Sequence, residues 1–167
     1  VDQFHAKELS EHLQAQALLI RESVQDRFDR SHAKELDLFV KNLAKDTGLE
    51  LRITLIDREG VALADSQARP EEMESHTNRR EVQRALTNGW GEDTRYSATL
   101  YREMKYVAIR IGPAESPMGV ARVAMPISSI SRQRVVIEQI IWTIMLLGLV
   151  ASILFALGLA RIWSYPL

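Results

Sequence analysis

The sequence predicts an α+β fold in which an antiparallel sheet of about five strands packs on a long N-terminal helix, followed by a C-terminal transmembrane helix. Apolar residues first recur at helical spacing, and short apolar segments separated by turn residues follow. A run without any charged side chain then extends over residues 140–160. The fold class rests on these three patterns.

Composition limits the functional classes. Of the 167 residues, 26% are charged, both signs are interspersed and the net charge is −1, so a nucleic-acid partner is not expected. The chain has no Cys, which excludes disulfides, thiol catalysis and Cys-based metal sites. It begins with Val and stops just beyond the apolar run, which predicts that both ends are truncated.

An amphipathic helix is predicted over residues 1–48. No Pro or Gly occurs between residues 4 and 45, and apolar residues recur there at steps of three and four. The stripe is interrupted at residues 29–32, where a break or kink is left open, and Thr47-Gly48 ends it. It consists of Leu9, Leu13, Ala17, Ile20, Val24 and Phe28, and then of Leu36, Phe39, Val40 and Leu43.

Strand signals follow the helix. The first two strands flank a hairpin turn at residues 57–60, where Gly60 occupies the position that favours positive φ. A short helix is expected to open at Asn78, which has capping-box spacing to Glu81, and to stop at Asn88-Gly89. The predicted strands are residues 51–56, 61–64, 92–100, 103–111 and 118–127.

A sheet of this size needs cover on one face. The strand region spans about 80 residues, too few for a sheet to bury its own apolar surface. The amphipathic N-terminal helix is the expected cover.

The apolar run at residues 140–160 has the length of a membrane span. At 1.5 Å per residue it reaches about 31 Å, matching a hydrocarbon core of roughly 30 Å. Trp142 lies near one end, and Trp163 and Tyr165 lie past the other, where aromatic rings favour membrane interfaces. No Gly or Pro occurs between Ser129 and Gly148, which predicts a stiff rod into the membrane.

An ordered set of residues extends through residues 50–127. It consists of Arg52-Ile-Thr-Leu-Ile-Asp57, Gly60, Leu63-Ala-Asp-Ser66, Pro70, Met73-Glu-Ser-His76, Arg79, Glu81-Val82, Ala85-Leu86, Gly89, Arg95-Tyr-Ser-Ala-Thr-Leu100, Met104, Tyr106-Val-Ala108 and Gly119-Val120. This set resembles the extracytoplasmic sensor of bacterial histidine kinases of the phosphate-regulon type, a single Cache domain with a PAS-like fold. Two residues depart from the family pattern: Ser75 replaces the usual Asn, and Arg80 the usual Pro.

The end of the chain, residues 160–167, is similar to the start of a HAMP linker. Arginines on both sides of the span leave its orientation open, but the resemblance implies that residues 1 to about 138 are extracytoplasmic in a bacterial inner membrane. The expected organisation is a signalling and dimerisation helix (1–48), a sensor domain (49–127), a juxtamembrane helix (128–139), a transmembrane helix (140–162) and the start of the linker (163–167).

No motif indicates catalysis within this chain, and no cofactor is expected. Any enzymatic activity would belong to a parent kinase that autophosphorylates with ATP. His5, Glu8 and His12 share one helix face, but a solvated charged face is the favoured interpretation and no metal site is predicted. Asp65-Ser66 after a strand is expected to cap a turn.

A ligand pocket is the better candidate site. In a PAS-like sheet, the face away from the long helix is roofed by the segment between strands, here residues 67–91. Alternate strand residues point to opposite faces, so either Arg95 with Ser97 or Tyr96 can line it. Cationic donors suit a carboxylate or a phosphate. The alternative is structural, with core tyrosines and a surface ion pair. The candidates are Arg95, Tyr96, Ser97 and Tyr106 from the strands, and His76, Arg79 and Arg80 from the roof.

Small residues at steps of four predict a helix dimer interface within the membrane: Gly148, Ser152, Ala156 and Ala160. The functional hypothesis is therefore a homodimeric input segment of a two-component sensor histidine kinase, embedded in a lipid bilayer. Its partner would be a small anionic ligand or a periplasmic protein. The alternatives are an input domain of a chemoreceptor or diguanylate cyclase, and a ligand-free dimerisation or docking domain.

Overall fold

The computed structural model describes residues 2–47, 50–97, 101–127, 141–149 and 152. The chain divides into two compact units, Val1–Ile127 and Ser128–Leu167. The first unit contains the helices and the sheet, and the candidate site lies within it.

Two helices form the N-terminal part of the first unit. They are α1 (Asp2–Val24) and α2 (Ala33–Thr47), and two short 3-10 turns, η1 (Gln25–Arg27) and η2 (Arg30–His32), separate them. At the break, the Asp29 side chain accepts a hydrogen bond from the Ser31 N–H at 3.2 Å. The interruption predicted near residues 29–32 therefore divides the segment into two helices.

The sheet has five antiparallel strands in the order β2-β1-β5-β4-β3. The last strand in the sequence thus lies at the centre, where Thr54 pairs with Arg122 and Ala124 pairs with Tyr106. The predicted number of strands is confirmed. Their bounds are β1 (Arg52–Asp57), β2 (Ala62–Asp65), β3 (Trp90–Ser97), β4 (Arg102–Ile111) and β5 (Gly119–Pro126).

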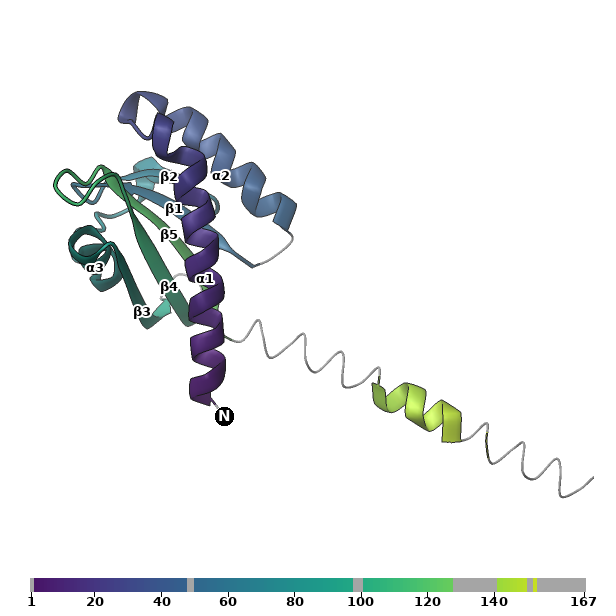
Figure 1. Cartoon of the computed structure of the whole chain (residues 1–167). Helices are drawn as coiled ribbons and strands as arrows, with labels where there is room; N and C mark the ends of the chain where they lie inside the picture. The colour runs from purple at the N-terminus through teal and green to yellow at the C-terminus, as the bar shows by residue number, and fades with distance from the viewer. Residues whose placement is uncertain (1, 48–49, 98–100, 128–140, 150–151, 153–167) are drawn as a thin grey trace, which may run out of the picture. The chain divides into compact units, whose positions relative to one another are not determined.

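Helices cover both faces of the sheet (Figure 1). On one face, α1 contacts β4 and β5 while α2 contacts β1 and β2, and we call this the helix-pair face. The apolar stripe of α1 is buried here, from Leu9 to Val24. The other face, which we call the α3 face, carries α3 (Arg80–Asn88) against β3, β4 and β5. The core under α3 consists of Ile56, Val82, Ala85, Ala108 and Val120.

The hairpin turn and the loop before α3 are in close contact. Gly60 has φ 85°, as predicted, and its carbonyl accepts a hydrogen bond from the His76 N–H at 2.8 Å. A Cβ at Gly60 would lie 2.6 Å from the Thr77 nitrogen, so glycine is required there. The loop also contains the 3-10 turn η3 (Pro70–Glu72). It is therefore held against the β1–β2 hairpin.

The capping box expected at the start of α3 is wrong. The N-cap residue is Arg79, not Asn78, and no side chain caps the helix there. The Glu81 carboxylate instead binds arginines of the sheet, because charged partners outweigh a backbone N–H. The C-terminal end agrees with the prediction, since Gly89 takes a left-handed conformation with φ 92°.

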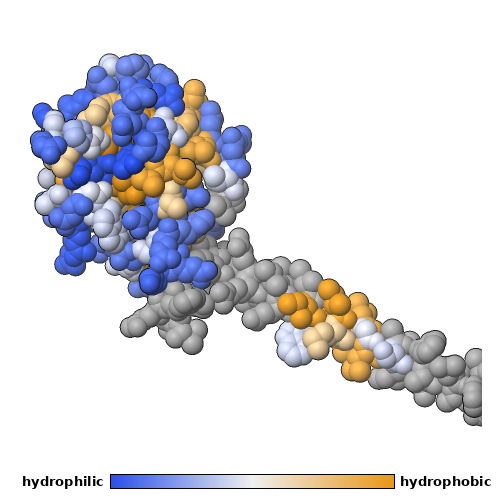
Figure 2. Space-filling view, in the orientation of Figure 1, coloured by the Kyte–Doolittle hydropathy of each residue, from blue (hydrophilic) through white to orange (hydrophobic). Residues whose placement is uncertain are grey.

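In the second unit, residues 141–149 are helical and expose apolar side chains such as Trp142 and Leu147 (Figure 2). No helix in the described part of the chain is long and apolar enough to cross a membrane. A Cβ at Gly148 would meet no atom within 4 Å, and Ser152 is exposed. Ala156, Ala160, the juxtamembrane segment 128–139 and the linker start 163–167 lie outside the described residues, as does most of the predicted span.

Candidate functional site

The first turn of α3 lies directly on β3, and a glycine makes this possible. A Cβ at Gly91 would be 2.4 Å from the Glu81 carbonyl oxygen and 3.0 Å from the Ala85 nitrogen. Any larger residue would push the helix away from the sheet. This close packing puts the Glu81 side chain, which is fully buried, over the centre of the α3 face.

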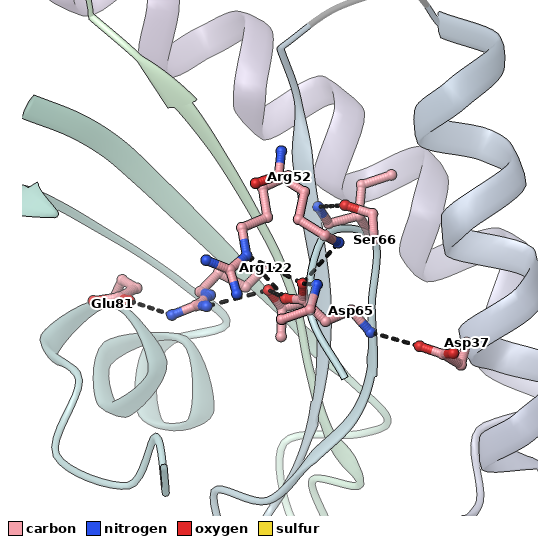
Figure 3. A network of polar contacts seen from close by, with 10 residues as sticks. Asp37, Arg52, Asp65, Ser66, Glu81 and Arg122 are labelled. Carbon is pink, nitrogen blue, oxygen red and sulfur yellow. Dashed lines mark hydrogen bonds and ion pairs between the residues drawn. The ribbon is translucent and has the colours of Figure 1, made fainter. Parts of the chain in front are cut away.

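Glu81 binds arginines from two strands. Arg95 of β3 donates to both carboxylate oxygens, at 2.9 Å and 3.1 Å, and to Asp93 at 3.1 Å. Arg122 of β5 donates to the same carboxylate at 3.4 Å (Figure 3). The carboxylate thus bridges an outer strand and the central strand. Burial opposes the charge of Arg95, but its hydrogen bonds to Glu81 and the negative charge there raise its pKa above the usual value.

A second carboxylate, Asp65 at the end of β2, continues the network. Its oxygens accept from Arg52 at 3.1–3.2 Å and from the Thr54 hydroxyl at 2.7 Å, and that hydroxyl accepts from Arg122 at 3.1 Å. Asp65 also accepts from the backbone N–H groups of residues 67 and 68 at 2.9 Å and 2.8 Å, so it caps the turn as predicted. Strands β1, β2, β3 and β5 therefore all contribute to one polar cluster. Figure 3 shows Arg52, Asp65 and Arg122 of this cluster.

Tyr106 of β4 lies between the two arginines. The guanidinium carbon of Arg95 is 3.8 Å from the centre of its ring, and that of Arg122 is 5.4 Å away. Both distances allow cation–π attraction, which strengthens when the cation is removed from water. The ring therefore helps to hold two positive charges side by side.

Arg122 has too few partners for a buried cation. Only 3% of its surface is exposed, its one carboxylate contact is the 3.4 Å contact to Glu81, and its Nε has no partner in the described structure. Burial lowers the pKa of Arg122 to about 10, although the charge of Glu81 acts against this. A buried guanidinium with an unused N–H is a strong anion-binding group.

His76, in the loop before α3, adds a second unused polar atom. Its exposed fraction is 6%, and its Nδ1 has no hydrogen-bond partner among the described residues. Burial, together with the charges of Arg122 and Arg79, lowers the pKa of His76 to about 4, so the ring is neutral at pH 7. A neutral imidazole can donate or accept one hydrogen bond at this position.

The predicted site residues divide into two groups. Arg95, Tyr106 and His76 belong to the cluster. Tyr96 alternates to the opposite face and is 60% exposed, and Arg80 is also exposed. Arg79 is half-buried at the N-cap of α3, and Ser97, at the end of β3, is half-buried as well.

The prediction missed five members of the cluster, which are Arg52, Thr54, Asp65, Glu81 and Arg122. One signal was present, because Arg122 is the only charged residue in the otherwise apolar segment 119–126. A charge in the middle of a predicted buried strand indicates a buried partner or a ligand.

An open hollow of ≈ 350 Å³ lies away from this cluster, beside the break between α1 and α2. Its lining includes Arg30 and Arg58, and Arg30 is paired with both Asp57 and Glu59. In the described structure, the buried polar atoms without a partner are His76 Nδ1 and Arg122 Nε. The α3 face is therefore the stronger candidate for a charged ligand.

Neither a protein-family model nor a curated protein matches this chain in sequence. Solved structures do match in fold. The sensor domain of the Vibrio cholerae histidine kinase DctB is 17% identical with a TM-score of 0.53, over 78% of this chain and 56% of that one. The ligand-binding domain of the Campylobacter jejuni chemoreceptor Tlp3, in complex with 4-methylisoleucine, is 13% identical with a TM-score of 0.59, over 75% and 54%.

A third similar structure is the ligand-binding domain of the Pseudomonas aeruginosa amino-acid chemoreceptor PctC in complex with GABA. It is 14% identical, has a TM-score of 0.55, and covers 75% of this chain and 62% of its own. The match thus spans between half and two thirds of the length of these three domains. The expected Cache-type, PAS-like fold is confirmed, and it is shared by sensor domains of a histidine kinase and of chemoreceptors.

Proposed function

We propose that the chain is the signal-input segment of a membrane-anchored receptor, and that its sensor domain binds a small anionic ligand on the α3 face. The ligand would lie against Arg95, Arg122 and Tyr106, with His76 at the edge of the site. Residues 1 to about 138 would be extracytoplasmic, and the apolar run at residues 140–160 would cross the inner membrane.

Arg122 is the observation that supports this proposal most strongly. A buried arginine that serves stability alone is normally paired through both ends of its guanidinium. Arg122 has one long carboxylate contact, one hydroxyl contact and a buried Nε without a partner in the described structure. A ligand carboxylate would supply the missing acceptor.

Carboxylate is the ligand class that the geometry favours. Two guanidinium groups lie near the Tyr106 ring, at 3.8 Å and 5.4 Å from its centre, and present flat, forked donors that match the planar shape of a carboxylate. The ligands named for the chemoreceptor structures, 4-methylisoleucine and GABA, both carry this group. We extend that chemistry to this site as part of the proposal.

The proposed output is a cytoplasmic histidine kinase that acts through ATP-dependent autophosphorylation, and a chemoreceptor or a diguanylate cyclase is the alternative. The chain would work as a homodimer whose membrane helices meet along Gly148, Ser152, Ala156 and Ala160. Small residues at this spacing let two helices approach closely in lipid. Ser152→Ile would then weaken dimerisation in a membrane reporter assay, and unchanged dimerisation would contradict this interface.

Ligand binding is tested by thermal unfolding of the full chain in detergent against a panel of small carboxylates. A ligand at 100 times its Kd adds about 2.7 kcal/mol of stability. Arg95→Ala should abolish that gain, whereas Arg69→Ala should not, because Arg69 is exposed and paired only with a surface carboxylate. If no carboxylate stabilises the wild type, the ligand-free docking alternative is favoured.

Orientation is tested separately. Because the chain has no Cys, a single cysteine placed in the loop at residues 112–119 gives a clean labelling site. We expect membrane-impermeant reagents to label it in intact cells. Labelling only after lysis would place the sensor domain in the cytoplasm and contradict the proposal.

A further inference from the structure

We infer that Glu81 competes with the ligand. In the ligand-free state its carboxylate binds Arg95 and Arg122, and a ligand carboxylate must displace it. This inference rests on the proposed function. It adds a regulatory contact to that site, because the same displacement would move the first turn of α3.

The geometry of Glu81 supports this role. Arg95 holds it through two parallel hydrogen bonds of 2.9 Å and 3.1 Å, and Arg122 holds it at 3.4 Å. The first pair has the fork-to-fork arrangement in which arginine binds a free carboxylate. The anion site is thus already occupied by a side chain of the protein. A ligand can therefore gain both arginines only if Glu81 leaves.

Once displaced, the Glu81 carboxylate can bind elsewhere in the protein. Glu81 is in the first turn of α3, where no side chain caps the free backbone N–H groups. A carboxylate in the first turn is stabilised by those N–H groups and by the helix dipole. The displaced carboxylate can thus leave the arginines and bind the free N–H groups at the start of its own helix. This costs less free energy than leaving a buried charge unpaired.

The same geometry couples release to movement. The Glu81 backbone lies against Gly91, where a Cβ would be only 2.4 Å from its carbonyl oxygen. Because the helix and strand are in direct contact there, a change in the contacts of Glu81 would act directly on the position of this turn over β3. Ligand binding would therefore be reported as a displacement of α3.

The test is a carboxylate that replaces the missing side chain. Glu81→Ala keeps Cβ and removes a group with the size and charge of acetate, so sodium acetate should bind the full-chain variant in detergent and raise its unfolding temperature. Acetamide, which has nearly the same shape and no charge, should not. We expect at least a tenfold lower midpoint concentration of acetate for Glu81→Ala than for the wild type. Glu72→Ala, a change at an exposed ion pair, should behave like the wild type.

Glu81→Gln provides a second test if the alanine variant does not fold. It keeps the shape of the side chain but loses the charge that holds the arginines, so acetate should again bind more tightly than it binds the wild type. The inference is overturned if acetate affects a folded Glu81 variant no more than the wild type. In that case the proposed function would still stand if a panel carboxylate stabilises the wild type and depends on Arg95.

Discussion

The two faces of the sheet are built from different chemistry. On the helix-pair face, apolar residues of α1 and α2 meet buried apolar strand residues such as Ile53, Leu55 and Val123. This face also holds one ion pair, in which buried Lys105 binds Glu92 and Ser10 of α1 contacts the carboxylate. The α3 face has an apolar core under the helix, but beside it lie three arginines and two buried carboxylates. Apolar packing stabilises a fold more reliably than buried ion pairs do, because desolvation offsets most of their attraction.

We interpret this difference as a division of tasks, in which the helix-pair face mainly stabilises the fold and the α3 face is the candidate ligand site. The α3 face keeps charged groups where apolar ones would serve stability equally well or better. Such a departure from stable design is typical of a functional site. Substitutions on each face in turn test this interpretation.

The largest loss of stability is expected for Glu81→Ala. It leaves Arg122 buried without any carboxylate partner, which typically costs about 3–5 kcal/mol. Urea unfolding of the full chain measures this loss as a lower free energy of unfolding. Glu72→Ala is the matched control and should change it by less than about 0.5 kcal/mol, because both partners of that ion pair are exposed. Equal effects of the two substitutions would show that the cluster on the α3 face is not a coupled network.

Leu13→Ala on the helix-pair face should cost about 3 kcal/mol, because Leu13 is fully buried and its removal leaves a cavity. The substitution should change stability alone. The Kd of a carboxylate for the folded protein should not change, as measured by isothermal titration below the unfolding transition. A large shift in affinity would argue against separate tasks for the two faces.

His76 predicts a dependence of stability on pH. Its pKa is lowered from 6.5 to about 4 by burial and by Arg122, so the unfolded chain binds more protons than the folded chain between these values. The contribution of His76 to stability is therefore complete above pH 6.5 and is lost as pH falls, by about 2 kcal/mol at pH 5. The variant His76→Gln should lack this part of the pH dependence in urea unfolding. An identical pH profile in the variant would contradict the assignment.

Tyr106→Phe should have the smallest effect. The contact with Arg95 is made by the ring, at 3.8 Å, and phenylalanine keeps that ring. We expect a change in unfolding free energy below about 0.5 kcal/mol and little change in carboxylate affinity, whereas Tyr106→Leu should weaken both. If Tyr106→Phe alone abolishes binding, the hydroxyl and not the ring is the functional group.

The fold could largely be predicted from the sequence because its signals are local. The helical stripe from Leu9 to Phe28, the hairpin glycine Gly60 and the helix stop at Gly89 each report a nearby backbone conformation. The break between α1 and α2 was visible as an interruption of the stripe. The predicted start of α3 was wrong, because the Glu81 carboxylate binds arginines of the sheet instead of capping the nearby helix end. The third strand, β3, also begins at Trp90, two residues before its predicted start.

The candidate site could be predicted only in part, because the order of the strands in the sheet decides which of its residues are neighbours. Arg122 reaches Thr54 because β5, the last strand, inserts between β1 and β4. The sequence pattern around Arg122 or around Thr54 does not indicate that the two residues are neighbours. Arg95 and Tyr106 were among the predicted candidates, but alternation along the strand left open whether Arg95 with Ser97 or Tyr96 faces the candidate site. The carboxylates that complete the cluster come from other elements, so their spacing in the sequence carries no signal.

The most direct measurement compares the wild type with the triple variant Glu81→Met/Arg95→Met/Arg122→Met, using unfolding with and without the carboxylate panel. The substitutions replace the Arg95–Glu81–Arg122 ion group by apolar side chains of similar length, a change that often leaves stability equal or higher. We therefore predict a free energy of unfolding at least as high as that of the wild type, with no stabilisation by any carboxylate that stabilises the wild type. A triple variant that is still stabilised as strongly by the same carboxylate would contradict a ligand site on the α3 face.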